Sequence, residues 1–305
     1  MSNNKIGIAI VAPAGFAPDP AALQRGIAAL EAQGCRVHNY YDPAEKFQRF
    51  GGTDAARLAQ FHAAAADPEV QIVMALRGGY GLSRLLPVLD YNLLAESGKL
   101  FVGHSDLTAF QMALLKHTGA VSFSGPMLCD DFAREAPSDF MCGQFWQCLI
   151  GPTHAVTNLI PQNNPALEVS GTLWGGNLTM LTHLVGTPYM PQVDGGILFV
   201  EDVSEHPYRV ERMLLQLLYS GVLARQKAVL LGDFSNYRLG DFDNGYDFDA
   251  MLAYFRAQSP VPVLTGLPFG HVRDKATLAV GCQATLRSDT QNWQLTMRGY
   301  PVLEC

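Results

Sequence analysis

The chain has 305 residues, 48% of them hydrophobic and 16% charged, and this composition excludes an intrinsically disordered protein. Its length fits one large domain or two domains of about 150 residues each. The formal net charge of −7 has the wrong sign for a surface that neutralises a phosphate backbone, so we expect no nucleic-acid partner. No apolar run approaches the roughly 18 residues of a membrane-spanning helix, and no secretory signal precedes Ile6. We therefore expect a cytoplasmic protein without membrane contact.

The cysteines are scattered and form no Cys-x-x-Cys pair. They are Cys35, Cys129, Cys142, Cys148, Cys282 and Cys305. This pattern argues against a zinc cluster and, in a chain of this length, against a disulfide scaffold. No group of His, Cys, Asp and Glu residues has metal-ligand spacing, so we expect mostly reduced thiols and no metal.

The first half of the chain alternates strand-like and helix-like segments. The expected strands cover residues 6–11, 36–41, 70–76, 100–103 and 120–123. The helical segments between them include one capped by Asp19 and ended by Gly34, an Ala-rich one opened by Thr53, and an amphipathic one over 107–117. Strands joined by helical crossovers predict a parallel, doubly wound sheet over about residues 1–130.

Residues 130–165 have poor periodicity and several prolines, which predicts a boundary between two domains. Beyond it, expected strands at 168–174, 196–200, 228–234, 261–267, 277–286 and 293–298 are interspersed with helices near 176–184, 208–219 and 248–257. We therefore expect an N-terminal α/β domain over 1–150, a linker over 151–165, and a C-terminal β-rich, mixed α/β domain over 166–305.

Ser105 lies in the segment Gly103-His104-Ser105-Asp106, between an expected strand and an expected helix. A serine on such a sharp turn projects its hydroxyl clear of the sheet, and N–H groups at the helix start can bind an oxyanion, as in a nucleophile elbow. However, Leu107 stands where the G-x-S-x-G pattern has its second glycine, and a serine at a helix start is often an N-cap. Both interpretations of Ser105 stay open.

A serine nucleophile needs a base, and His271 is the best-placed histidine. It follows the expected strand 261–267 and a Pro-Phe-Gly run, in a loop past the carboxyl end of that strand. The alternative is that His271 is an ordinary polar loop residue. His104 is adjacent to the serine, where side chains point apart, and His206 precedes Pro207 at a helix entry.

The carboxylate that would orient the base is sought at Glu201-Asp202, which ends the expected strand 196–200. Strand alternation puts these two acids on opposite faces, so only one can face a given site. The alternative is that either acid caps the helix beginning near His206, or pairs with Arg209 or Arg212. The pattern does not choose between the faces.

Two glycine turns complete the set of candidates. Arg77-Gly78-Gly79-Tyr80-Gly81 ends the strand before the one that leads to Ser105, so the two loops can meet at the carboxyl edge of a parallel sheet. Such a loop suits an oxyanion donor or a phosphate cradle, although no phosphate-binding motif is present. Trp174-Gly175-Gly176-Asn177 is expected to serve packing and capping.

Together these segments resemble the bacterial LD-carboxypeptidases, or muramoyltetrapeptide carboxypeptidases, over nearly the whole chain and in order. The segments that carry the resemblance are Arg77 to Gly81, Gly103 to Asp106, Ser124-Gly125-Pro126-Met127, Gly171 to Asn177, Glu201-Asp202 with Glu205-His206-Pro207-Tyr208-Arg209, and Gly266 to His271.

The resemblance implies a serine peptidase whose triad is Ser105, Glu201 and His271. It also implies a Rossmann-like or flavodoxin-like N-terminal domain, a β-rich C-terminal domain, an active site between them, a homodimer, and no metal or cofactor. The implied activity is cytoplasmic removal of the terminal D-alanine from murein tetrapeptides, at the bond from the L-centre of meso-diaminopimelate or lysine.

For such chemistry we expect the backbone N–H of Asp106, with that of Gly78 or Gly79, to form the oxyanion hole. Arg77 and Arg84 are the nearest candidates to bind the terminal carboxylate of the substrate, and bracing of the loop is the alternative for Arg77.

Two other functions stay open. A related branch of the family cleaves peptidyl-nucleotide antibiotics of the microcin C type for immunity, and the compact length and the run from Glu205 to Arg209 favour the recycling enzyme over it. A non-catalytic ligand-binding protein of two α/β lobes is the third possibility, which a turnover assay separates from the other two.

Overall fold

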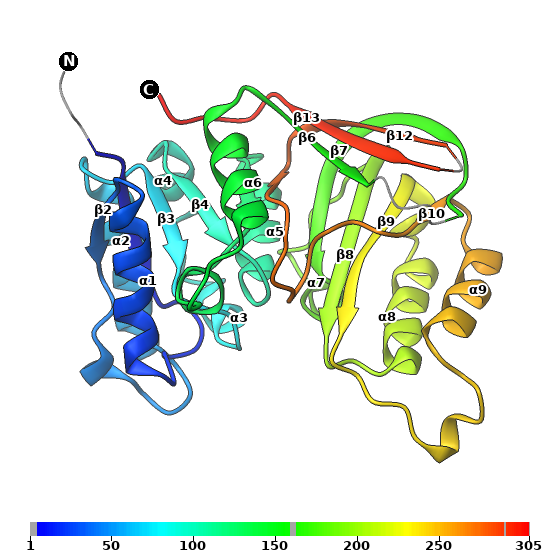
Figure 1. The fold of residues 1–305 in the computed structure, drawn as a ribbon, viewed down its shortest axis with the longest axis horizontal. Helices are drawn as coiled ribbons and strands as arrows, with labels where there is room; N and C mark the ends of the chain where they lie inside the picture. Colours follow the sequence, from blue (N-terminus) through cyan, green and yellow to red (C-terminus); the bar gives the residue numbers. More distant parts are fainter. Residues whose placement is uncertain (1–4, 159–162, 290, 305) are drawn as a thin grey trace.

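The computed structural model describes residues 5–158, 163–289 and 291–304 and arranges them in two adjacent halves, each built around its own sheet (Figure 1). Both halves combine strands and helices, which confirms the expected mixed α/β fold class. Within the described residues, no helix is long and apolar enough to cross a membrane.

The first half contains a six-stranded sheet in the order β11-β5-β4-β3-β1-β2. Its strands are β1 Gly7–Val11, β2 Arg36–Asn39, β3 Ile72–Ala75, β4 Leu100–Gly103, β5 Ser122–Ser124 and β11 Leu278–Val280. All neighbours are parallel except β11, which runs antiparallel to β5. The parallel strands are those expected from the alternating pattern of the sequence.

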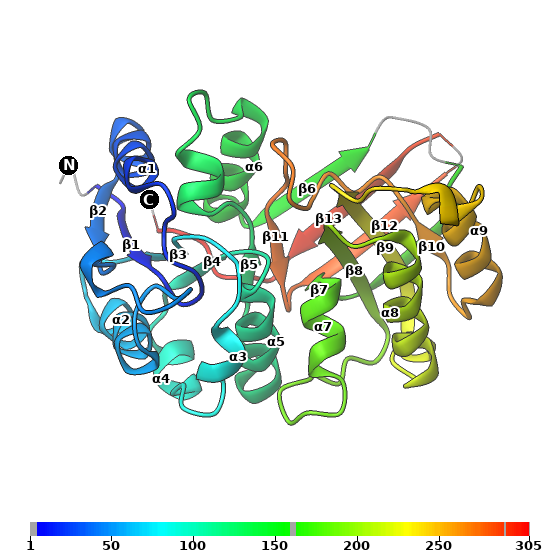
Figure 2. The same cartoon turned by 90° about the horizontal axis from the view of Figure 1, so that it is seen from below.

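Helices cover both faces of this sheet, and apolar strand residues are buried beneath them. The helices are α1 Pro20–Ala32, α2 Asp54–Ala66, α3 Leu82–Leu85, α4 Tyr91–Glu96, α5 Leu107–Thr118 and α6 Asp139–Ile150. Helices α1 and α6 lie on one face, and α2, α4 and α5 lie on the other (Figure 2). Because β1, β3 and β4 are buried along their whole length, they form the centre of the core.

The second half contains a seven-stranded sheet in the order β10-β9-β8-β7-β12-β13-β6. Its strands are β6 Thr153–Asn158, β7 Leu167–Asn177, β8 Gly196–Val203, β9 Gln226–Ser235, β10 Val263–Leu264, β12 Gln283–Ser288 and β13 Trp293–Arg298. Strands β7 to β10 are parallel, and β7, β12, β13 and β6 pair antiparallel. Helices α7 Leu178–Leu184, α8 Pro207–Tyr219 and α9 Phe248–Gln258 pack in sequence beside one another.

The chain returns from the second half to the first, whereas the predicted division assigns all of residues 166–305 to the C-terminal domain. The single strand expected over 277–286 is two strands, β11 in the first sheet and β12 in the second. Gly281, at φ +97°, lies between them, and a left-handed residue there redirects the chain from one sheet to the other. One short strand of the N-terminal half is therefore supplied by the C-terminal part of the chain.

The expected linker over 151–165 also contains regular structure. Residues Thr153–Asn158 form β6, whose alternate side chains are buried and which pairs with β13. Residues 159–162 lie outside the described part of the chain. Three inward positions in six residues are too short a pattern to predict a strand, and the strand that pairs with it is about 140 residues away in the sequence.

Five of the cysteines are free thiols, and Cys305 lies outside the described residues. Burial raises the pKa of the Cys35 thiol to about 11 and that of Cys282 to about 12. Both thiols are therefore inert core side chains at neutral pH.

Candidate active site

Ser105 lies on a strained turn between β4 and α5. Its φ of +61° is in the left-handed region, which non-glycine residues seldom adopt. Gly103 precedes the turn, and a Cβ there would lie 2.8 Å from Leu107 Cδ2 and 3.0 Å from Ala75 Cβ. The position at the N-cap of α5 belongs to Asp106, whose side chain makes no capping bond. The local geometry is thus that of a nucleophile elbow, and the N-cap interpretation of Ser105 does not describe it.

The Asp106 carboxyl connects this elbow to the glycine loop. It is buried, and its Oδ2 accepts a hydrogen bond from the Leu82 N–H at 2.9 Å, at the end of that loop. Burial raises the pKa of Asp106 to about 6, against the opposing effects of that hydrogen bond and of the Arg57 charge. Arg57 is itself buried and donates to Gly81 O at 3.0 Å. Side chains from two elements therefore hold the glycine loop against the elbow.

Gly78 is in contact with Ser105. A Cβ on Gly78 would lie 2.7 Å from Ser105 Oγ, so only a glycine lets the loop pass this close. Within the described part of the chain, the backbone N–H groups of Gly78, Gly79 and Asp106 donate no hydrogen bond to a protein acceptor. None of the three amides of the expected oxyanion hole is thus engaged by another described group, and Gly78 is the one shown against the serine.

The two arginines considered for carboxylate binding differ in their surroundings. Arg84 forms an ion pair with Asp54 at 2.7 Å. Arg77 donates from Nη1 to Phe16 O at 3.3 Å, which braces the loop, but its buried Nε has no partner. No ion pair of Arg77 is found among the described residues. Arg77 therefore combines a bracing contact with an uncompensated charge.

Glu201 and His271 form a hydrogen-bonded pair in the second half. Glu201, near the end of β8, is fully buried, and its Oε2 lies 2.8 Å from His271 Nδ1. Its other oxygen accepts from Asn177 Nδ2 at 3.2 Å. Because the Nδ1 atom is the one bonded to the carboxylate, the Nε2 atom of His271 is free to take a proton.

Asp202 follows a register shift between β8 and β9, shares the Asn177 amide with Glu201, and serves α7. Its Oδ2 accepts from the N–H and the hydroxyl of Thr179 at 2.9 and 2.7 Å, and its Oδ1 accepts from Asn177 Nδ2 at 3.0 Å. The helix that it stabilises is therefore α7, and not the one beginning near His206. His206 caps that second helix itself and contacts Asp243 at 3.1 Å.

The ionisation of His271 reflects two opposing influences. Burial disfavours its charged form, but the hydrogen bond and the charge of Glu201 outweigh burial and raise the pKa of His271. Its side chain is 21% exposed. Its ring packs edge-on against that of His104, with centroids 5.0 Å apart. Since His104 is adjacent to Ser105, the Glu201–His271 pair of the second half lies beside the Ser105 turn of the first half. Among the described contacts, no direct hydrogen bond joins Ser105 to His271.

Three further side chains near this site have contacts that the sequence pattern does not predict. Asn177 was expected only to cap a helix; it caps α7 through Met180 N and also bonds both neighbouring acids. Lys275 and Asp131 form a buried ion pair at 2.8 Å. The Trp-Gly-Gly-Asn turn gave a signal for Asn177, whereas nothing in the local sequence marks a buried lysine or its partner. In the described part of the chain, no group of three or more His, Cys, Asp and Glu residues could hold a metal ion.

Comparisons with known proteins agree with this architecture. The family model described as the LD-carboxypeptidase N-terminal domain matches residues 8–125, and the LD-carboxypeptidase C-terminal domain matches residues 170–286. The Bacillus subtilis protein named "Probable murein peptide carboxypeptidase" is 30% identical over 289 residues, which cover 92% of this chain and 88% of that protein.

Two solved structures are also similar. A muramoyltetrapeptide carboxypeptidase from Oxalobacter formigenes has a TM-score of 0.93 and 55% sequence identity, over 97% of this chain and 100% of its own. The microcin C7 self-immunity protein MccF of Escherichia coli is 27% identical over 303 residues, covering 89% of this chain and 87% of that protein. A structure of MccF superposes with a TM-score of 0.88 over 98% of this chain and 97% of its own.

The chain belongs to the LD-carboxypeptidase family, as its sequence motifs indicated. It is a serine-type carboxypeptidase, and therefore a hydrolase.

Proposed function

We propose that this carboxypeptidase removes the terminal D-alanine from murein tetrapeptides, in peptidoglycan recycling, through a triad of Ser105, His271 and Glu201. The names of the Bacillus and Oxalobacter relatives support the murein peptide as substrate. The observation that carries the triad is the 2.8 Å bond between the buried Glu201 carboxylate and His271 Nδ1, beside the strained turn of Ser105.

In this mechanism the Ser105 hydroxyl attacks the carbonyl carbon of the scissile bond while His271 Nε2 takes its proton. The tetrahedral intermediate collapses, His271 returns the proton to the departing amino group of D-alanine, and an acyl-enzyme remains. Water, activated by the same Nε2, then hydrolyses the acyl-enzyme. Glu201 keeps the proton of the neutral ring on Nδ1 and stabilises the imidazolium that forms in each half-reaction.

The oxyanion of each tetrahedral intermediate would be bound by the N–H of Asp106 and that of Gly78 or Gly79. Their lack of other acceptors and the contact between Gly78 and Ser105 support this assignment. Donors that are already oriented need no rearrangement as the negative charge develops on the oxygen.

Arg77 is our candidate for the free carboxylate of the terminal D-alanine. Its charge has no ion-pair partner in the described residues, and it lies in the same loop as Gly78. The protein is anionic overall, so this group would act locally and not through a long-range field. Recognition of that carboxylate would make the enzyme an exopeptidase.

A second candidate function is cleavage of a peptidyl-nucleotide for immunity, which the similarity to MccF over most of both chains supports. The chemistry of the triad would be the same. The two functions differ in what lies beyond the scissile bond: an amino acid with a free carboxylate, or a nucleotide conjugate.

One experiment separates these functions. The purified protein is given murein tetrapeptide, the same peptide with its D-alanine carboxylate amidated, and a peptidyl-nucleotide, and the products are followed by mass spectrometry. D-alanine release from the first substrate alone is expected. Equal cleavage of the amide would overturn carboxylate recognition, and cleavage of the nucleotide conjugate alone would assign the protein to the immunity branch. Turnover of none of the three would overturn both proposed substrates.

We further propose that the enzyme works in the cytoplasm as a homodimer, as the family resemblance implies. Light scattering coupled to gel filtration tests the dimer, and fractionation of cells that express the full chain tests the compartment.

A further inference from the structure

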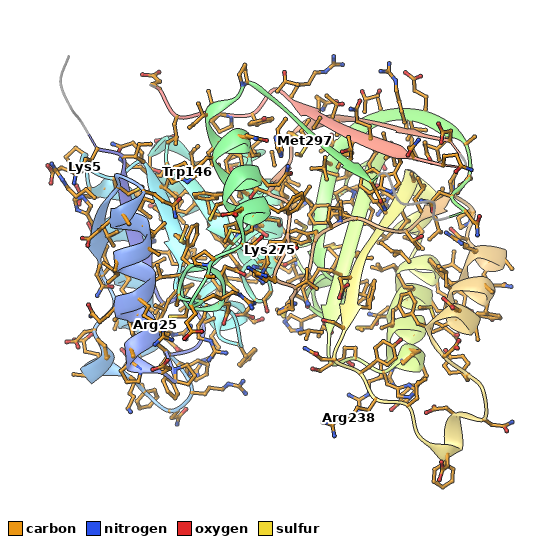
Figure 3. All side chains as sticks on the ribbon, viewed as in Figure 1. Lys5, Arg25, Trp146, Arg238, Lys275 and Met297 are labelled. Atoms are coloured by element: carbon orange, nitrogen blue, oxygen red, sulfur yellow. The ribbon has the colours of Figure 1, made fainter. Side chains whose placement is uncertain are left out.

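A buried polar chain connects the candidate base to the interior of the first half. Lys275 is 1% exposed, lies 2.8 Å from Asp131 Oδ1, and places its Nζ 3.3 Å from His104 Nε2. His104 is 2% exposed and Asp131 is fully buried. Lys275 lies centrally, between the two halves of the molecule (Figure 3). Burying a lysine and an aspartate costs free energy, so the pair must be held by specific contacts.

The contacts of His104 determine which of its nitrogens carries the proton. Its Nδ1 lies 2.9 Å from the Gly125 carbonyl oxygen, which can only accept, so Nδ1 bears the hydrogen. Its Nε2 then has a lone pair that accepts from the Lys275 ammonium. Burial and the Lys275 charge both lower the pKa of His104 well below its usual range. His104 is therefore a neutral ring of one fixed tautomer, next to Ser105 and against His271.

Lys275 also joins the loop that carries His271 to the first half. Lys275 is four residues beyond His271 in the sequence. Its partner Asp131 lies in the single π-helical turn Leu128–Phe132, which follows β5. The preceding residue, Asp274, accepts from the Ser138 hydroxyl at 2.5 Å, at the N-cap of α6. The loop from the second half is thus anchored at two successive residues onto the part of the protein that bears the nucleophile.

We propose that Lys275 is a positioning residue for His271: it donates to the Nε2 lone pair of the His104 tautomer that Gly125 sets, and it holds the loop of the base against the nucleophile loop. This role rests on the proposed function of His271 as the base.

The charge of Lys275 is a second part of this role. The groups that act on His271 are Glu201 and Asp202 from β8, Asp233 from β9, the neutral His104, and Lys275. Only Lys275 among these opposes protonation of His271 by its positive charge. It therefore limits how far the two β8 acids stabilise the imidazolium and leaves the base neutral over a wider pH range.

The test uses the full chain and the double substitution D131N/K275M, which removes both buried charges so that neither remains unpaired. Side-chain ¹⁵N NMR titration of the histidines is the first readout, and it needs no substrate. We expect His104 to be the neutral Nδ1–H tautomer near pH 7 in the wild type. We expect the His271 titration to move to higher pH in the variant, because Lys275, and not Asp131, is among the charges that act on His271. A wild-type His104 that is charged or carries its proton on Nε2, or an unchanged His271 titration, would overturn the inference.

Kinetics on the murein tetrapeptide are the second readout. The variant should lose about ten-fold or more in kcat with KM within about three-fold, and the acid limb of kcat/KM should move to higher pH with the NMR titration. The matched control is Arg273→Met, which removes an exposed positive charge from the same loop and should leave both readouts unchanged. A loss of kcat with no movement of the acid limb would indicate a merely structural role. If the wild type does not cleave the tetrapeptide, the proposed substrate is wrong, and the NMR titration still decides the role of Lys275.

Discussion

The two sides of the active site are built by different means. On the nucleophile side, the working groups are one hydroxyl and several backbone amides, and the conformations of Ser105 and of the glycine loop position them. On the acid–base side, the working groups are ionisable side chains, which are oriented by hydrogen bonds between strands and loops far apart in the sequence. The first side therefore depends on local steric limits, and the second on the charges of buried neighbours. Substitutions on the nucleophile side should therefore act through steric displacement, and substitutions on the acid–base side through changes in pH dependence.

The largest effect is expected where the two sides meet. Ser105→Ala and His271→Ala should each lower kcat by about 10⁴-fold or more, and the double variant should lose little beyond either single one, because nucleophile and base act as a unit. Stopped assays on the tetrapeptide measure these rates. Retention of more than about a tenth of the wild-type rate by Ser105→Ala would show that another group is the nucleophile.

The acid–base side is tested by its two neighbouring carboxylates. Glu201→Gln should lower kcat by about 10²- to 10³-fold, because the imidazolium loses its buried counter-charge. Wild-type kcat/KM should fall as pH drops through the pKa of His271, which is raised above 6.5, and this limb should move to lower pH in the variant.

Asp202→Asn is the matched control for that substitution. It should keep activity within about ten-fold, while the free energy of unfolding falls by about 1–3 kcal/mol because the amide has one acceptor oxygen and presents an NH2 donor to either Thr179 or Asn177. Rate profiles and urea denaturation of both variants provide the comparison. An equal loss of activity in the two variants would mean that Glu201 has no distinct role.

The nucleophile side is tested by adding one methyl group. Gly78→Ala would put a Cβ 2.7 Å from Ser105 Oγ, so either the loop or the serine must move, and kcat should fall by about 10²-fold with the fold retained. Gly143→Ala in α6 is the control, since a Cβ there meets nothing within 4 Å. Circular dichroism checks the fold of each variant. Full activity of Gly78→Ala would show that the glycine loop does not contribute to the oxyanion hole.

The smallest effect concerns stability at Asp106, which links the elbow to the glycine loop. Burial raises the pKa of its carboxyl from 3.8 to about 6, so the folded state holds this proton more tightly than the unfolded chain does. The resulting stabilisation is complete below pH 3.8 and is lost as pH rises through about 6. Asp106→Asn has no such proton to lose. Relative to the wild type, its free energy of unfolding should rise by up to about 3 kcal/mol between about pH 4 and about pH 7.

Urea denaturation of both proteins at the two pH values measures that difference. A difference between Asp106→Asn and the wild type that does not change with pH would mean that the Asp106 carboxyl is already ionised at pH 4 in the folded protein.

The amino-acid sequence by itself determined the elements whose signals are local. The alternation of apolar and helical segments predicted the five parallel strands of the first sheet, and the strand end at Gly103 with the helix start at Leu107 predicted the turn at Ser105. Such features are set by the conformational preferences of a few consecutive residues, so they can be recognised without knowing what packs against them.

Tertiary structure alone decided the features whose partners are distant in the sequence. Period-two alternation predicts opposite faces for Glu201 and Asp202, but only the pairing of β8 with β7 and β9, and the return of the 265–277 loop, determine that Glu201 meets His271. The same holds for the buried Lys275 and Asp131. A charged side chain has no periodic signal for burial, because its burial depends on a counter-charge that a different part of the chain supplies.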